Sequence, residues 1–232
     1  MGARLAALTA KNVLKVFLDK RTATPSLSAA REWGENGLPK EIVRGWRERV
    51  NEHILANPLT IEELDKLREK EGDKRVKQVE DDPALAYGST ILCALLTGEF
   101  IIFAQLGDGD ILAVSSDGEV KRPVPTDERL IANETTSLCL PKAWDDFRVT
   151  FQPLSGSAPA LVMLSTDGYS NSFRDEAGFL KAGSDYLNLI REDGIDFVEK
   201  HLPDWLNEAS QSGSGDDVTL AIGYLMESPA KV

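Results

Sequence analysis

Histidine and cysteine are scarce in this sequence of 232 residues, which has two of each. His53 and His201 stand apart, and Cys93 and Cys139 lack the spacing of metal ligands, so the sequence gives no pattern for a zinc site. Neither histidine lies in a motif with a plausible nucleophile, which disfavours covalent catalysis by a Ser–His or Cys–His pair. Two cysteines without a pairing pattern indicate reduced thiols and a cytoplasmic protein.

Long apolar runs and an excess of basic residues are also missing. Runs such as Ile91–Leu96 are far shorter than the roughly 20 residues of a membrane helix, and residues 1–20 are amphipathic, unlike a signal peptide. The net charge of −12, from 26 basic and 38 acidic residues, disfavours nucleic acid, whose phosphates select basic surfaces. We therefore expect neither a membrane nor a nucleic acid as partner.

The spacing of apolar residues predicts a single α+β domain over residues 1–232. Helical spacing occurs early and late in the chain, and Thr60 with Glu63 forms a capping-box pattern. In the middle of the chain, apolar residues follow the spacing of β-strands, and the tight turns between these strands predict an antiparallel meander. The charged residues 70–82 are expected to form an exposed connector or insertion, and residues 123–146 a long, partly irregular excursion. Expected helices cover residues 2–17, 39–55, 60–71, 183–190 and 195–206, and expected strands 90–96, 100–106, 111–115, 119–122, 148–152, 160–165 and 218–225.

Three turns carry acidic side chains next to apolar runs. They are Gly107-Asp108-Gly109-Asp110, Leu164-Ser165-Thr166-Asp167-Gly168-Tyr169 and Gly215-Asp216-Asp217-Val218-Thr219-Leu220. Each turn places a carboxylate where a strand begins or ends, so that the three can converge. Carboxylate oxygens are hard donors of the kind that Mg²⁺ and Mn²⁺ prefer. The three turns therefore predict one site for divalent cations.

Taken in order with Tyr87-Gly88-Ser89-Thr90, these turns resemble the motifs of the metal-dependent protein phosphatases of type 2C, the PPM family. The likeness is greatest to the compact bacterial branch and covers nearly the whole chain, including residues 133–139 and 169–173. A lone Asp-Gly is a weak signal, because this chain also has such turns at Asp117 and Asp193. Four motifs in family order are much more specific.

The resemblance implies an α-β-β-α sandwich of two antiparallel sheets flanked by helices, with two Mg²⁺ or Mn²⁺ ions at one end. By this match Asp167 and Asp216 would ligate metal directly, and Asp108 would help to hold a weaker third ion. Neighbouring residues with a possible secondary role are Gly168, Asp110, Asp217 and Thr166. The hydroxyl groups expected either to line the mouth or to serve ordinary turns are those of Ser165, Thr166, Thr135 and Thr136.

The implied reaction is hydrolysis of phosphoserine or phosphothreonine on a protein, with the two metal ions polarising a bridging water. A phosphorylated protein would be the substrate, and a cognate Ser/Thr kinase would be a further partner.

One family motif is not found in the sequence. Members of the family have a first strand that ends in Asp-Gly-His-Gly or a near variant, whose aspartate bridges the two ions, and an upstream arginine that binds phosphate. The chain instead opens on Met1-Gly2-Ala3-Arg4-Leu5-Ala6, which resembles the following helix, so we expect an N-terminally incomplete domain without the first strands. Two hypotheses stay open: this chain is part of a longer protein that is an active phosphatase, favoured because the three aspartates are retained, or it is a catalytically degenerate module that binds a protein partner or phosphopeptide. Both predict weak or absent hydrolysis by these 232 residues.

Overall fold

The computed structural model describes residues 1–20, 26–126, 136–154 and 158–225. The chain divides into two compact units, a helical unit (Met1–Ile91 with Leu130–Phe147) and a sheet unit (Leu92–Arg129 with Arg148–Val232). In the described ranges, no helix has both the length and the apolar character needed to cross a membrane. Both cysteines are buried free thiols, as predicted, and burial raises the pKa of Cys93 to about 12.

The helical unit is built on α1 (Gly2–Lys20) and α3 (Leu38–Ala56), which pack against each other. Trp46 of α3 is fully buried, and its indole N–H donates to the Gly2 carbonyl at 3.2 Å. Helix α2 (Leu27–Glu32) runs through the π-helical turn η2 (Trp33–Gly37) into α3. Both long helices were predicted, and the buried apolar stripe at helical spacing explains why.

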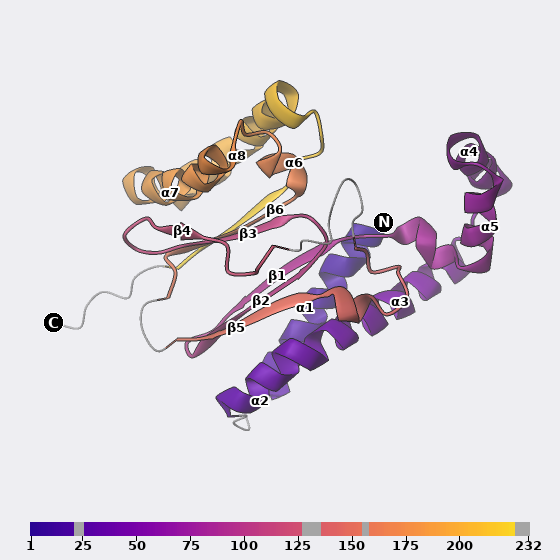
Figure 1. The fold of residues 1–232 in the computed structure, drawn as a ribbon, viewed down its shortest axis with the longest axis horizontal. Coiled ribbons are helices and arrows are strands. Elements are labelled where there is room, and N and C mark those ends of the chain that lie inside the picture. Colours follow the sequence, from indigo (N-terminus) through magenta and orange to yellow (C-terminus); the bar gives the residue numbers. More distant parts are fainter. Residues whose placement is uncertain (21–25, 127–135, 155–157, 226–232) are drawn as a thin grey trace. The chain divides into compact units, whose positions relative to one another are not determined.

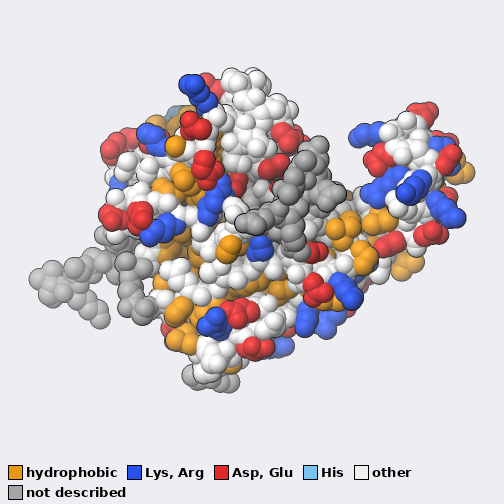
Figure 2. Space-filling view, viewed as in Figure 1, with side chains coloured by type: hydrophobic (Ala, Val, Ile, Leu, Met, Phe, Trp, Pro, Cys, Tyr) orange, Lys and Arg blue, Asp and Glu red, His pale blue; other side chains and the backbone are white. Residues whose placement is uncertain are grey.

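Helix α4 (Ile61–Glu71) begins with the predicted capping box, because Thr60 and Glu63 each bond the other's backbone N–H. The prediction for residues 70–82 is wrong. Most of this stretch forms helix α5 (Asp73–Asp81), which packs on α4 and buries Val76 and Val79. Figure 2 shows basic and acidic side chains intermixed over these two helices, so the charges are the solvated face of an amphipathic pair. The 3₁₀ turn η3 (Pro83–Tyr87) follows.

The sheet unit contains two antiparallel sheets (Figure 1). One has the strand order β1–β2–β5 and the other β4–β3–β6–β7. The predicted meander is wrong at one point, because β2 and β3 lie in different sheets and the turn between them crosses from one sheet to the other. The strands are β1 (Ile91–Leu96), β2 (Phe100–Leu106), β3 (Asp110–Val114), β4 (Val120–Lys121), β5 (Arg148–Pro153), β6 (Leu161–Ser165) and β7 (Leu220–Tyr224).

Strand β6 shows how the layers of the sheet unit are assembled. Val162 and Leu164 belong to an apolar cluster with Ile101 and Phe103 of the other sheet. Leu161 and Met163 point the opposite way, into a cluster with helices α7 (Glu176–Asp193) and α8 (Ile195–Ala209). These helices cover one face of the sheet β4–β3–β6–β7 (Figure 1). The predicted α+β class, with two antiparallel sheets and flanking helices, is confirmed.

Candidate metal centre

The first corner of the site lies where β6 ends and the short helix α6 (Asp167–Ser170) begins. Thr166, between them, does not cap the helix with its side chain. Its hydroxyl accepts from the Thr219 N–H at 2.9 Å and donates to the Asp217 carbonyl at 3.2 Å, and its own N–H donates to the Thr219 carbonyl at 3.1 Å. The hydrogen bonds of Thr166 therefore hold the turn with Asp167 against the turn with Asp216 and Asp217.

Close backbone packing at Gly168 strengthens this contact. A Cβ atom added to Gly168 would lie 2.7 Å from the Asp217 carbonyl oxygen and 3.2 Å from the Asp216 Cβ, so the two turns can approach this closely only at a glycine. The Gly168 carbonyl accepts hydroxyl hydrogen bonds from Ser172 at 2.7 Å and Ser214 at 2.8 Å. Ser214 ends the π-helical turn η5 (Ser210–Ser214).

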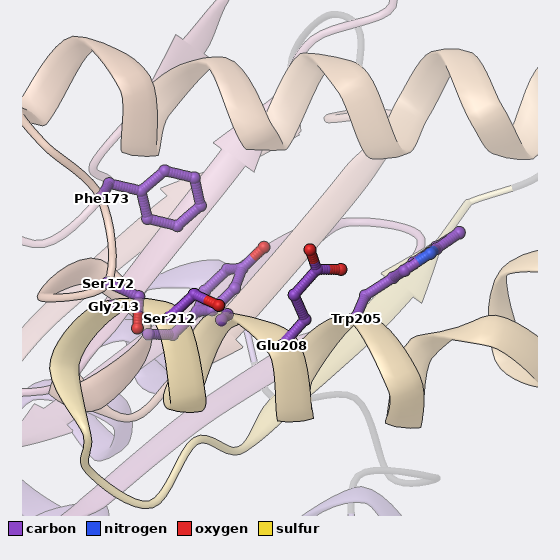
Figure 3. A pocket seen from close by; sticks show the side chains of 8 residues that line it. Ser172, Phe173, Trp205, Glu208, Ser212 and Gly213 are labelled. Atoms are coloured by element: carbon purple, nitrogen blue, oxygen red, sulfur yellow. The ribbon is translucent and has the colours of Figure 1, made fainter.

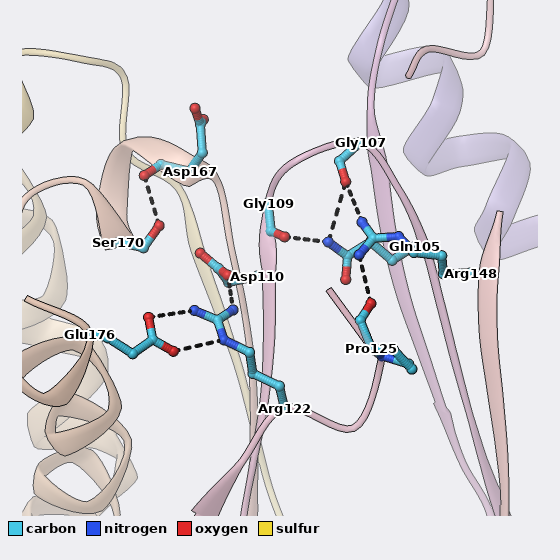
Figure 4. Close-up of polar contacts among 10 residues, drawn as sticks. All are labelled: Gln105, Gly107, Gly109, Asp110, Arg122, Pro125, Arg148, Asp167, Ser170 and Glu176. Carbon is cyan, nitrogen blue, oxygen red and sulfur yellow. Dashed lines mark hydrogen bonds and ion pairs between the residues drawn. The ribbon is translucent and has the colours of Figure 1, made fainter. Parts of the chain in front are cut away.

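The turn around Asp108 is held from below by two long side chains (Figure 4). The Gln105 amide donates to the carbonyls of Gly107 and Gly109, and the Arg148 guanidinium donates to Gly107 at 2.6 Å. A Cβ on Gly109 would lie 2.7 Å from the Ser165 carbonyl oxygen, which places this turn against the end of β6. Ser165 itself is buried. Thr136 belongs to the helical unit, and Thr135 lies outside the described residues.

Asp110, at the start of β3, has a cationic partner that the sequence did not reveal. Its buried carboxylate forms an ion pair with Arg122. The same guanidinium bonds both oxygens of Glu176, at 3.0 and 3.1 Å, and lies 5.2 Å above the Phe179 ring. Figure 4 shows the Asp167 carboxylate pointing away from this ion-pair cluster. Arg122 thus balances the charge of Asp110 and ties the turn to the first residue of α7.

The charges of two predicted ligands, Asp108 and Asp216, act on the third, Asp167. Burial raises the pKa of the Asp167 carboxyl above its ordinary value, and the negative charges of Asp108 and then Asp216 raise it further. Over the described ranges, no three or more His, Cys, Asp or Glu side chains are gathered in a set that could hold a metal ion. Carboxylate donors and a shared negative potential suit a hard divalent cation, and the assignment of ligands stays a prediction.

The pKa of Asp167 gives a testable pH dependence. Because the folded state holds this proton more tightly than the unfolded state, the contribution of Asp167 to stability should become more favourable as pH falls from neutral through its raised folded-state pKa. At pH 7 in EDTA, Asp167→Asn is therefore expected to raise the midpoint of thermal unfolding, since it removes a carboxylate that burial and two like charges disfavour.

The exposed Asp204→Asn on α8 serves as the matched control and should leave the midpoint unchanged. A lower midpoint for Asp167→Asn than for this control would contradict the convergence of the three carboxylates.

Residues 1–207 match the model of one protein family, described as Protein phosphatase 2C. The chain belongs to this family. No curated protein matches it. Among solved structures, this phosphatase 2C family member is similar to a bacterial serine phosphatase with an arginine substitution (16% identity over 87% of this chain and 70% of the other, TM-score 0.48). It is also similar to the serine/threonine phosphatase Stp1 of Staphylococcus aureus (15% identity, 78% and 75% coverage, TM-score 0.44) and to PstP/Ppp of Mycobacterium tuberculosis (20% identity, 67% and 72% coverage, TM-score 0.44). Four bacterial serine phosphatase chains are matched over 54% to 74% of their own length.

Proposed function

We propose that this member of the phosphatase 2C family hydrolyses phosphoserine or phosphothreonine in proteins with Mg²⁺ or Mn²⁺, and that these 232 residues do so weakly. The observation that carries the proposal is the contact between the turns of Asp167 and Asp216 at Thr166 and Gly168. The negative charges of Asp108 and Asp216, which lie on two other turns, raise the pKa of Asp167 in agreement with it. In the proposed assignment Asp167 and Asp216 hold a cation, and Asp108 contributes to a weaker site.

Bound divalent cations would activate water as the nucleophile and offset the repulsion between a phosphate and an acidic protein. The chain's own residues hold the ligands in place. Thr166 and Gly168 keep the Asp167 and Asp216 turns in contact, and Gln105 supports the turn of Asp108. The proposed substrate is a phosphorylated protein, with a cognate Ser/Thr kinase supplying the phosphate.

Metal binding and turnover test this proposal separately. Calorimetric titration with Mn²⁺ should show saturable binding that Asp216→Asn weakens by more than about tenfold, because even indirect support of a ligand is worth that much. Asp217→Asn is the matched neighbour, since the contacts of Asp217 with Thr166 and Asp216 use its backbone, and it should bind Mn²⁺ as the parent chain does.

Hydrolysis of p-nitrophenyl phosphate by the same chain with Mn²⁺ should be slow and should disappear in Asp216→Asn. Absence of Mn²⁺ binding would refute the proposal. Mn²⁺ binding with no hydrolysis at all would favour the second hypothesis, a degenerate module that binds a partner or phosphopeptide.

A further inference from the structure

A pocket of about 300 Å³ opens beside α8 in the sheet unit (Figure 3). Its lining consists of three aromatic side chains, one glutamate and four small residues. We name it the aromatic pocket, and its lining includes Tyr169, Ser172, Phe173, Trp205, Glu208 and Gly213.

The aromatic rings of the pocket are held in place by their neighbours. Tyr169 and Phe173 meet edge to face, with centroids 5.1 Å apart and planes at 87°, so they form two walls at a right angle. The Tyr169 hydroxyl bonds the buried hydroxyl of Tyr186 at 3.3 Å. Trp205 stacks on His201 of the same helix, at 5.7 Å between centroids. The pocket is therefore preformed, and a ligand would not have to order these rings.

Glu208 gives the pocket its charge. Glu208 is exposed, and Figure 3 shows its carboxylate between Phe173 and Trp205. Within the described part of the chain, this carboxylate has no hydrogen-bond or ion-pair partner. An unpaired carboxylate beside aromatic rings fits a cation with a flat apolar surface. Guanidinium stacks on aromatic faces and bonds a carboxylate through two N–H groups, which an ammonium group does less well.

We infer that the aromatic pocket binds an arginine side chain of a protein ligand, stacked on the rings and paired with Glu208. A chain with a net charge of −12 favours basic ligands in general, and the pocket would give this attraction a specific position.

The pocket is lined by residues that neighbour the acidic turns in the chain. Tyr169 lies two residues after Asp167, and Gly213 lies three residues before Asp216. The Ser172 hydroxyl bonds the Gly168 carbonyl. A segment anchored in the pocket would therefore run beside the acidic turns, and, resting on the proposed function, we assign the arginine to the phosphopeptide substrate.

The first test uses the metal-free chain in EDTA and the indole N–H signals of its four tryptophans by NMR, with the Trp205 signal assigned from Trp205→Phe. The probes are N-acetyl-arginine methylamide and its citrulline analogue, which has the same shape without the charge. Arginine should shift the Trp205 signal saturably, with a dissociation constant about threefold to tenfold below that of citrulline.

Glu208→Gln should remove the preference for arginine, whereas the exposed Glu199→Gln on the same helix should keep it. Equal binding of the two probes, or no shift of the Trp205 signal, would overturn the inference. Neither result bears on Mn²⁺ binding, which is measured in a separate titration and should be unchanged in Glu208→Gln. If the unmodified chain does not bind Mn²⁺, the proposed function is refuted, and arginine binding remains as an independent result.

Discussion

Replacing Arg122 with methionine is expected to lower the free energy of unfolding by about 3 kcal/mol, because removal of one partner of a buried ion pair leaves the other charge uncompensated. Asp110 is buried at the start of β3, and the Arg122 guanidinium is its ion-pair partner. The same substitution removes the two bonds to Glu176. Methionine retains much of the contact with Phe179, so the loss reports mainly the charge.

Urea denaturation followed by circular dichroism measures this loss. Lys181→Met is the matched control, because it breaks the exposed pair between Lys181 and Asp185, at 2.7 Å, and should cost less than about 0.5 kcal/mol. The double variant Asp110→Asn with Arg122→Met should recover part of the stability, since it removes the stranded charge. If Arg122→Met costs no more than Lys181→Met, the ion pair contributes nothing beyond an exposed one.

The elements that could be predicted are those with a local signal. The capping box at Thr60 and Glu63 needs only residues three apart, and it is present as predicted. The acidic turns could be located because an aspartate beside a glycine interrupts the apolar runs, and Asp167 does lie two residues after the end of the buried strand β6. Their proximity could be expected from family order, and the charges that raise the pKa of Asp167 agree with it.

The crossing between the sheets could not be predicted from local pattern. A tight Gly-Asp turn between two apolar strands predicts a hairpin, and the turn at residues 107–110 satisfies that pattern. What sets it apart is long-range: Arg148 of β5 bonds the Gly107 carbonyl, and Asp110 pairs in register with Ser165 of β6. The two ends of the turn thus contact strands of different sheets. The first contact is with a residue some forty positions further along the chain, and the second with one more than fifty positions further.

Helix α5 and Arg122 were missed because their signals are sparse. Only Val76 and Val79 of α5 are buried, so the segment has the composition of a charged connector. Arg122 follows Lys121 in a basic pair, and nothing in the sequence around it indicates that Asp110 and Glu176 meet its guanidinium. The roles of Ser172 and Ser214 were missed for a similar reason, because isolated serines in polar turns form no periodic sequence pattern.

Gly168→Ala is expected to destabilise the sheet unit by about 1–2 kcal/mol and to weaken Mn²⁺ binding together with it. The added Cβ would meet the Asp217 carbonyl oxygen at 2.7 Å, which is backbone and cannot rotate away. Overpacking of this kind costs about 1–3 kcal/mol, and the better helix propensity of alanine offsets part of it.

To relieve the clash, the turn with Asp216 has to move away from the turn with Asp167, so the two proposed ligands separate and the affinity for Mn²⁺ should fall by about tenfold or more. Gly98→Ala is the matched control, because its Cβ would meet nothing within 4 Å and the glycine does not have a positive φ. This control should keep both its stability and its Mn²⁺ titration. Loss of stability without loss of Mn²⁺ affinity in Gly168→Ala would show that the metal does not depend on contact between the two turns, and the assignment of Asp167 and Asp216 to one ion would then be wrong.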